Sequence, residues 1–349
     1  MKVKLEEVCE RASSNLKQSD IIGMEGDYPI YGASGYIGNV NFYHQKNSYV
    51  AVVKDGAGIG RTTLHPAKSS VIGTMQYLVP KDNVIPEYLY YVVSHMHLEK
   101  YFTGATIPHI YFKDYKNEEF NLDSVDEQKQ IVNILGKCET IIKSRKRELK
   151  LLDDLIKARF VEMFGDPYVN PKGWIECALS EKLNLVGGYA FKSDMFDENG
   201  GIPVLRIGNI NTGYFKPIKL VYWQEDENLE RYAMHPGDLV MSLTGTVGKD
   251  DYGNVCILGD EYEMYYLNQR NAKLEIKEGI DKFYLSQLLK FDQIKKKLTG
   301  ISRGVRQANI SNKDILNLVV PVPPIELQNQ FAAFVNQVDK SKVVVASVR

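Results

Sequence analysis

The feature that most constrains this chain is a direct internal repeat, with an offset of about 200 residues between its two copies. The motif Thr103-Gly104 recurs as Thr299-Gly300, and similar residues flank both copies in the same order. The matched pairs are Tyr88 with Tyr284, Leu98 with Ile294, Ile110 with Ile310, Asp114 with Asp314, Gln128 with Gln328 and Ile131 with Phe331. This offset is too long for a solenoid repeat, so we expect two copies of one domain-plus-helix unit.

Each copy begins with short strand-like runs that Gly, Pro and Asn interrupt, and each closes with a helix. The runs read "YPIYGASGYIGNVNFY" in the first copy and "IPVLRIGNINTGYF" in the second. Short helical patterns follow in both copies before the closing helix. We therefore expect an α+β fold with one domain at 1–124, a long spacer helix at 125–165, a second domain at 166–323 and a shorter spacer helix at 324–349.

The first spacer helix can run without interruption, because no proline occurs between residues 126 and 164. At about 1.5 Å per residue it would be roughly 55–60 Å long, which exceeds the width of a small domain. Its apolar residues recur with heptad spacing, which favours an antiparallel coiled coil with the second helix over packing on its own domain. The expected contacts join Ile131, Leu135, Cys138, Ile142, Leu149, Leu152 and Ile156 to Phe331, Phe334, Val335 and Val338.

Charge and cysteine content exclude several classes of protein. The formal net charge is −1, so a nucleic-acid partner would have to bind a local basic patch. The four cysteines are widely separated and form no Cys-x-x-Cys pair, which argues against a zinc knuckle or a redox motif and fits reduced thiols in a cytoplasmic protein. The N-terminus lacks the apolar core of a signal peptide, and no apolar run of about 18 residues could span a membrane.

Two segments resemble catalytic motifs without completing them. "TGTVGK" at 244–249 ends like a phosphate-binding loop, but Asp250 follows where a Ser or Thr should hold magnesium, so a Gly-rich turn with a basic tip is favoured. Asp260, Glu275 and Lys277 resemble the metal-binding carboxylates and lysine of a nuclease, yet an ordinary half-buried strand explains the same alternation. We expect no catalytic residue and no metal site.

Local basic residues favour a nucleic-acid interface more strongly than the overall charge does. Between Lys290 and Lys313 lie seven basic residues and a single acidic one, Asp292. Arg303 and Arg306 lie in a Gly-containing loop beside Gln307 and Asn309. Arginine can read guanine, and glutamine or asparagine can read adenine, while nearby lysines neutralise phosphates. A solvated, charged helix end would show the same composition.

The assembled motifs resemble the specificity subunit of type I restriction–modification enzymes over essentially the whole chain. The residues that carry this resemblance are "VPVPPIELQ" at 320–328, its relative "LDSVDEQKQI" at 122–131, the two Thr-Gly motifs and "RFVEMFGDPYVNPKGW" at 159–174. The resemblance implies two target recognition domains that each read half of a split sequence in double-stranded DNA. It also implies an antiparallel helix pair that docks two modification subunits, with restriction subunits completing the complex. S-adenosylmethionine, ATP and magnesium would then bind the partner subunits rather than this chain.

The Gly-containing loop with its arginines predicts DNA contacts at particular positions. Arg303, Arg306, Gln307 and Asn309 are expected to face DNA, and the repeat extends this to Thr106 and His109. Gly60-Arg61 aligns with Gly248-Lys249, which makes Arg61 and Lys249 second-rank candidates at turn tips.

The same comparison raises a question about the helices. The second helix stops before it matches the first, so we expect Ile156, Phe160 and Met163 to lack a full partner within the chain. A modification subunit or a second copy of the chain would then cover them. Two other classes stay open, namely a metal-dependent nuclease using Asp260, Glu275 and Lys277, and a coiled-coil adaptor that does not bind DNA.

Overall fold

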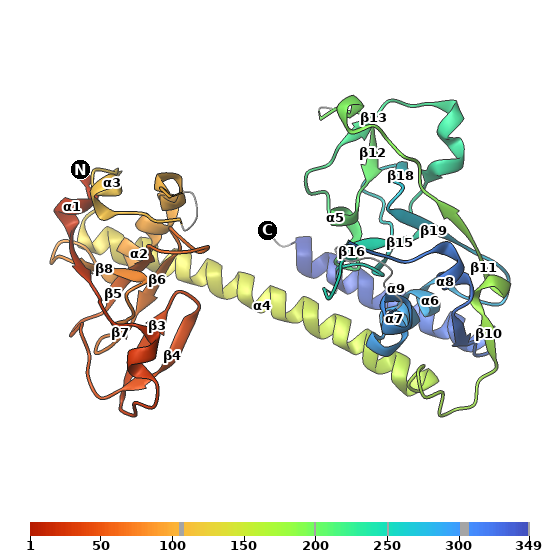
Figure 1. The fold of residues 1–349 in the computed structure, drawn as a ribbon, viewed down its shortest axis with the longest axis horizontal. Coiled ribbons are helices and arrows are strands. Elements are labelled where there is room, and N and C mark those ends of the chain that lie inside the picture. Colours follow the sequence, from red (N-terminus) through yellow and green to blue (C-terminus); the bar gives the residue numbers. More distant parts are fainter. Residues whose placement is uncertain (105–107, 199, 250, 301–306, 348–349) are drawn as a thin grey trace. The chain divides into compact units, whose positions relative to one another are not determined.

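The chain folds into two compact units, Met1–Ser144 and Arg145–Arg349. The structure is a computed structural model that describes residues 1–104, 108–198, 200–249, 251–300 and 307–347. The division between the units falls inside one long helix, α4 (Val125–Phe164) (Figure 1). Within the described residues, no helix is both long enough and apolar enough to cross a membrane.

The first unit is built on small sheets, antiparallel except for one parallel strand pair, with short helices against them. A four-stranded sheet has the order β2-β8-β5-β6, a three-stranded sheet has the order β4-β3-β7, and β1 pairs with β9. The elements are β1 (Lys2–Lys4), α1 (Leu5–Val8), β2 (Cys9–Ser13), η1 (Gln18–Ile21), β3 (Tyr28–Gly32), β4 (Gly35–Val40), β5 (Tyr49–Val53), β6 (Thr62–His65), β7 (Ser70–Val71), β8 (Met75–Pro80), α2 (Pro86–His95), η2 (Leu98–Tyr101), α3 (Phe112–Tyr115) and β9 (Glu119–Asn121).

The second unit repeats these sheets and adds further pairs. Its central sheet has the order β11-β19-β15-β17, β10 pairs with β21, and a mixed sheet has the order β13-β12-β18-β14. The elements are β10 (Glu176–Ala178), η3 (Leu179–Glu181), β11 (Leu183–Gly187), η4 (Ser193–Met195), β12 (Ile202–Leu205), α5 (Ile207–Ile210), β13 (Tyr222–Trp223), η5 (Glu227–Tyr232), β14 (Ala233–Met234), β15 (Leu239–Ser242), β16 (Thr244–Thr246), β17 (Val255–Ile257), β18 (Tyr265–Leu267), β19 (Asn271–Ile276), α6 (Lys282–Leu289), α7 (Asp292–Thr299), β20 (Gln307–Asn309), α8 (Asn312–Leu316), β21 (Val319–Pro321) and α9 (Ile325–Ser347).

The two units share one topology, which is the architecture expected from the repeat. In both, a four-stranded antiparallel sheet has the unit's second strand at one edge, and a closing strand pairs with the unit's first strand. In both, one parallel pair joins a smaller sheet, β3 with β7 in the first unit and β12 with β18 in the second. The strand β5 is buried along its whole length, because it lies between β6 and β8 and is covered on both faces.

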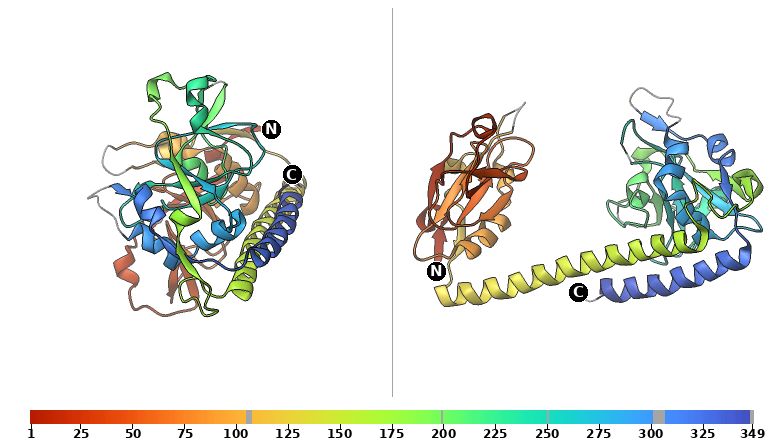
Figure 2. Two further views of the ribbon diagram at one scale, coloured as in Figure 1. Left: turned by 90° about the vertical axis from the view of Figure 1, so that its right-hand side faces the viewer. Right: turned by 90° about the horizontal axis from the view of Figure 1, so that it is seen from below.

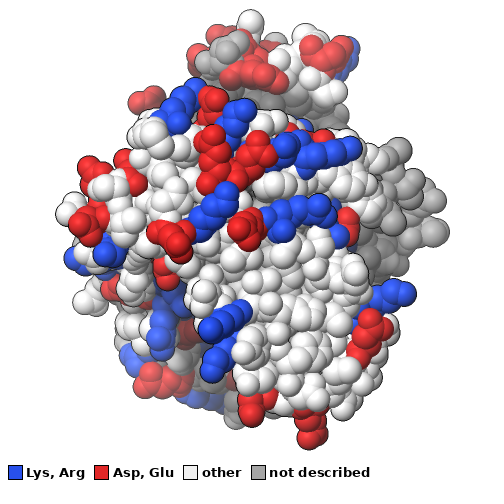
Figure 3. Space-filling model, turned by 90° about the vertical axis from the view of Figure 1, so that its left-hand side faces the viewer, with Lys and Arg blue, Asp and Glu red and all other residues white. Residues whose placement is uncertain are grey.

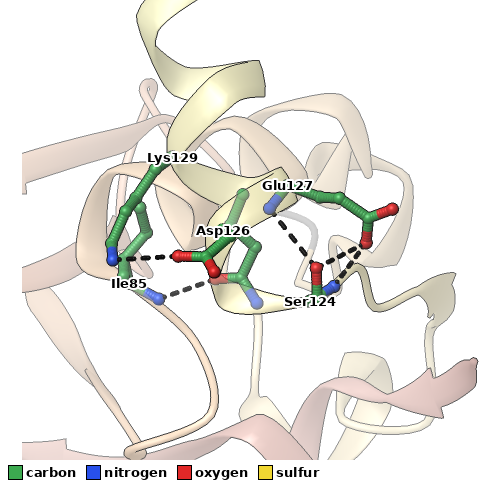
Figure 4. Close-up of polar contacts among 6 residues, drawn as sticks. Ile85, Ser124, Asp126, Glu127 and Lys129 are labelled. Carbon is green, nitrogen blue, oxygen red and sulfur yellow. Dashed lines mark hydrogen bonds and ion pairs between the residues drawn. The ribbon is translucent and has the colours of Figure 1, made fainter.

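A buried glutamine joins the start of each long helix to its own unit. In the first unit, the Gln128 side chain accepts a hydrogen bond from the N–H of Ile85 at 2.9 Å. Its amide donates to the carbonyl oxygens of Asn83 and Asp123, both at 2.9 Å. The start of α4 is also capped by Ser124 and Glu127, whose side chains hydrogen-bond each other's backbone N–H (Figure 4).

The second unit uses the same contacts at α9. The Gln328 side chain accepts from the N–H of Asp281 at 2.8 Å and donates to Pro323 O at 2.7 Å and Gly279 O at 3.5 Å. Here Pro323 and Pro324, rather than a capping pair, set the extended entry to the helix. The two helices therefore begin at equivalent places although the residues before them differ.

The helix α9 packs antiparallel on the second half of α4 (Figure 2). The ring centroids of Phe160 and Phe331 lie 5.5 Å apart, and Lys342 Nζ lies 2.8 Å from an Asp153 carboxylate oxygen. As the residue number falls along α4 it rises along α9, which establishes the antiparallel direction. The expected antiparallel helix pair is thus present.

The register of this pair differs from the sequence-based expectation. Ile156 and Phe160, which the sequence predicts to lack a full partner within the chain, are 7% and 0% exposed, and Met163 packs against the same core. That core contains Phe331, Val335 and Val338, with Phe334 and Leu152 packed against it. Leu152 and Ile156 therefore pack with α9 as expected, whereas the contacts expected for the residues nearer the start of α4 were wrong in register.

The strands that flank the helices explain this register. Because β10 follows α4 and pairs with β21, which precedes α9, the end of α4 lies beside the start of α9. Among the α4 residues that were expected to contact α9, Ile131 packs against the core of the first unit. Leu135 and Leu149 are half-buried, and Cys138 and Ile142 are exposed.

Candidate nucleic-acid interface

A two-stranded ribbon carries the described part of the predicted DNA-binding loop in the second unit. The strand β16 pairs antiparallel with β20, so that Thr244 lies opposite Asn309. The ribbon is tied to the core by a 2.9 Å hydrogen bond from the N–H of Ile310 to Leu243 O. Ala308 and Ile310 are buried while Asn309 is exposed. A ribbon of this kind fits the major groove of DNA, and an exposed asparagine can read adenine.

Several predicted contacts lie outside the described residues. These are Arg303, Arg306 and Thr106, together with the side chain of Gln307, whose backbone belongs to β20. Their assignment to DNA stays a prediction from the sequence.

The first unit places His109 where the second places Asn309. His109 forms isolated antiparallel bridges with Asp55 and with Thr103. The N–H of Ile110 donates to Lys54 O at 3.0 Å, which is the counterpart of the Ile310–Leu243 bond. Both units therefore have the same ladder of backbone pairings at this place. His109 of the first unit occupies the position that Asn309 has in the second.

The sequence comparison aligned Gly60-Arg61 with Gly248-Lys249, and the backbone hydrogen bonds show that this alignment is wrong. The N–H of Gly60 donates to Val53 O at 2.9 Å, and the N–H of Gly253 donates to Ser242 O at 2.8 Å. Both glycines have positive φ, 80° and 68°. Arg61 therefore corresponds to Asn254 rather than to Lys249.

Local contacts separate these turn residues further. Lys249 is exposed and lies in the segment between β16 and β17, which is longer than its counterpart in the first unit and so misled the alignment. The Arg61 guanidinium donates to Ala33 O, although the side chain is largely exposed. Asn254 accepts a hydrogen bond from Lys295 Nζ at 2.6 Å. The two turns thus share a backbone shape without sharing a basic tip.

The lysines of α7 divide into buried and exposed groups. Lys295 is only 8% exposed and faces Asn254, so it contributes to packing rather than to a phosphate-binding surface. Lys296 is exposed, and Lys297 lies over the ring of Tyr168 at 5.1 Å. The first unit is the part that faces the viewer in Figure 3, and there basic and acidic side chains are interleaved and a wide area carries neither charge. Charge on that face therefore does not define a DNA-binding surface.

Comparison with known proteins decides the family. A family model described as the type I restriction modification DNA specificity domain matches residues 1–152 and again residues 171–344. The chain belongs to this family. It is 27% identical over 316 residues to the type I restriction enzyme MjaVIII specificity subunit of Methanocaldococcus jannaschii, a match that covers 83% of this chain and 72% of that protein. The putative MjaX specificity subunit of the same organism is 22% identical over 329 residues, covering 87% of this chain and 72% of that protein.

A solved structure supports the fold of this specificity-domain chain. The crystal structure of the type I restriction–modification S subunit from M. genitalium aligns with a TM-score of 0.60 and 17% identity. The alignment covers 99% of this chain and 91% of that one. The resemblance inferred from the sequence motifs and the α+β fold with two repeated domains are both confirmed.

The nuclease-like residues of this family member have ordinary structural surroundings. Glu275 is exposed on β19 opposite Asn184, and Lys277 Nζ donates to Ser180 O at 2.9 Å. Asp260 lies in the loop after β17. No group of three His, Cys, Asp or Glu side chains in the described ranges could hold a metal ion. The segment 244–249 forms a strand and a turn, and the next element in the described part of the chain is the strand β17 and not a helix that could bind phosphate.

Sequence reasoning missed one residue that lies beside a predicted DNA contact, Asp55. Its carboxylate lies 2.5 Å from Nδ1 of His109. Aligning Gly56 with Gly245, instead of Gly60 with Gly248, would have matched Asp55 to Thr244. The position of Asp55 beside His109 follows only from the backbone pairing of their two segments.

Proposed function

We propose that this chain is the non-catalytic subunit that reads a two-part sequence in double-stranded DNA for a type I restriction–modification enzyme. The observation that carries the proposal is that both units present the same ladder with different outward residues, His109 in one and Asn309 in the other. Two equivalent domains with different side chains at the reading position would recognise two different half-sites. Membership of the specificity-domain family supports this reading.

Modification and restriction subunits would supply the chemistry. S-adenosylmethionine, ATP and magnesium would bind to those partners, and this chain would contribute DNA recognition and spacing. In the first unit, the helix α4 offers an exposed apolar stripe for docking, with Ile134 59% and Ile141 54% exposed two turns apart on one face. Exposed aliphatic side chains in a stripe mark an interaction surface, and we assign this one to a modification subunit.

The test is to map methylated bases in cells that express this chain together with the modification subunit of its own system. The proposal predicts a motif of two short specified sequences separated by an unspecified spacer. Replacing residues 1–124 with the corresponding domain of another family member should change one half of the motif and leave the other. Absence of a methylated motif, or a motif in one block, would contradict the proposal.

A further inference from the structure

Asp55 and His109 face each other across an isolated antiparallel bridge in the first unit, and their side chains are in contact. The Nδ1 atom of His109 lies 2.5 Å from an Asp55 carboxylate oxygen. The two side chains are 38% and 31% exposed, so the pair lies at the surface without being fully solvated. The residues are 54 positions apart in the chain, which means that the fold and not local sequence brings them together.

The backbone holds both residues in place. The N–H of Gly56 donates to Pro108 O at 3.0 Å, and the N–H of Ile110 donates to Lys54 O at 3.0 Å. On its other side, His109 exchanges two 2.8 Å backbone hydrogen bonds with Thr103. The histidine is thus the middle member of a three-segment ladder, and its Cα cannot shift without breaking bonds on both sides.

The chemistry of the contact determines which ring nitrogen faces outward. A carboxylate only accepts hydrogen bonds, so Nδ1 of His109 must carry the hydrogen. In the neutral ring this leaves the lone pair on Nε2. No hydrogen bond to Nε2 occurs among the described residues, and the His109 side chain is 38% exposed. The pair therefore offers a single acceptor of fixed tautomer.

A neighbouring aromatic ring restricts the imidazole further. The Tyr111 ring is stacked on His109 with centroids 6.3 Å apart and an interplanar angle of 21°. Tyr111 is 51% exposed, and Lys113 Nζ lies 5.3 Å from the centre of its ring. Aromatic and cationic groups beside a hydrogen-bonding side chain are suited to a nucleic-acid surface, where they contact bases and phosphates.

The second unit has a different arrangement at the same site. Thr244 occupies the place of Asp55, and Asn309 that of His109. The Thr244 hydroxyl is buried and has no hydrogen-bond partner among the described residues, so there it does not orient its neighbour. Asn309 carries both a donor and an acceptor, which suits the two-bond reading of adenine. Of these two side chains, only His109 of the first unit is limited to a single hydrogen-bond acceptor.

We propose that the Asp55–His109 pair determines the sequence specificity of the first unit, with Nε2 of His109 accepting a hydrogen bond from a base amino group in the major groove. The proposal rests on the proposed function and deepens it. The amino groups exposed in that groove are those of adenine and cytosine, so this position discriminates against guanine and thymine on the contacted strand. Asp55 is a positioning residue that acts through the histidine tautomer.

The test compares methylated motifs produced by the full chain with its modification subunit, using the wild type, His109→Ala and Asp55→Asn. An asparagine can either accept from or donate to Nδ1, so Asp55→Asn releases the tautomer while leaving the side-chain shape nearly unchanged. Both variants should accept additional bases at one position of one half-site. In binding assays with duplexes that carry each base pair there, discrimination should fall about tenfold.

The matched control is Asn309→Ala, which should relax the other half-site and leave the first intact. The double substitution Asp55→Thr with His109→Asn transfers the chemistry of the second unit, and we expect it to select adenine at the affected position. This variant keeps the test valid if His109→Ala folds poorly. A two-part wild-type motif that both single variants preserve would overturn the inference, and so would equal weakening of binding to all sequences. A wild type without any two-part motif would instead contradict the proposed function itself.

Discussion

Gln128 and Gln328 are fully buried equivalents that each join a long helix to its own unit through one accepted and two donated hydrogen bonds. Their six backbone partners correspond pair by pair through the repeat. Burial of a primary amide is costly unless its donors and acceptor are satisfied, and here the fold satisfies them in the same way twice. Each buried glutamine with its three backbone partners, called here the glutamine clamp, therefore sets the position at which the long helix leaves its domain.

Replacing Gln328 by alanine should destabilise the second unit by about 2–4 kcal/mol, because the substitution leaves three backbone groups without their buried partner. Urea unfolding of the full chain measures this difference. The exposed neighbour Gln330, replaced in the same way, is the control and should change the free energy of unfolding by less than about 0.5 kcal/mol. Equal effects of the two substitutions would show that the clamp does not stabilise the unit.

The first unit should lose stability in mild acid because of His65. Its side chain is 5% exposed, and burial lowers its pKa from the ordinary value of 6.5 to about 4. The unfolded chain therefore takes up a proton at higher pH than the folded one. Above pH 6.5 this histidine does not lower the free energy of unfolding. The free energy of unfolding decreases as the pH drops from 6.5 towards 4, and His65 lowers it no further below that.

The loss amounts to at most about 3 kcal/mol, taking 1.36 kcal/mol per pKa unit. Chemical unfolding at a series of pH values between 7 and 4 measures it. The variant His65→Gln should flatten this dependence, whereas the exposed His95→Gln should retain it. An unchanged slope in His65→Gln would exclude this histidine as the cause.

Thiol reactivity should separate the cysteines by burial. Cys138 is exposed on α4, while burial raises the pKa of both Cys9 and Cys256 to about 12. Since the thiolate is the reactive form, Cys138 should react rapidly with an aromatic disulfide reagent at pH 8, and the two buried thiols should react only after unfolding. The variant Cys138→Ser should remove the rapid phase. Rapid labelling of Cys9 in the native chain would contradict this order.

The exposed stripe of α4 should matter for docking and not for folding. Ile141→Asp should leave the unfolding transition unchanged and weaken co-purification of the modification subunit by about tenfold, since a charge would be buried at the interface. Ile218 is similarly exposed, at 56%, but lies in a loop of the second unit. Ile218→Asp is therefore the control and should have no effect on co-purification. Equal capture by both variants would place the docking surface elsewhere.

The same substitution at a buried position of α4 should behave differently. Ile156 is 7% exposed in the core of the second unit, so Ile156→Asp should unfold that unit rather than weaken docking alone. Loss of the near-ultraviolet dichroism signal of the full chain would report this unfolding. A folded Ile156→Asp variant would contradict the packing of α9 on the end of α4.

The sequence by itself determined the features that depend on local pattern and on comparison within the chain. The pairing of Gln128 with Gln328 revealed two copies of one fold, and the proline-free heptad run predicted α4 almost to its ends. The helix could be predicted because helix formation and amphipathic spacing depend on residues that are close in the sequence. The motifs around Pro321–Gln328 were sufficient to indicate the family.

Only the tertiary structure decided which distant residues meet. The pairing of β10 with β21 sets Phe160 against Phe331 and leaves Ile142 exposed, although the heptad pattern treats all these positions alike. The correspondence of Arg61 with Asn254 and the contact of Asp55 with His109 likewise follow from backbone hydrogen bonds between separate segments. Register between elements is a property of their connections and pairing partners, and a periodic pattern is satisfied equally well by several registers.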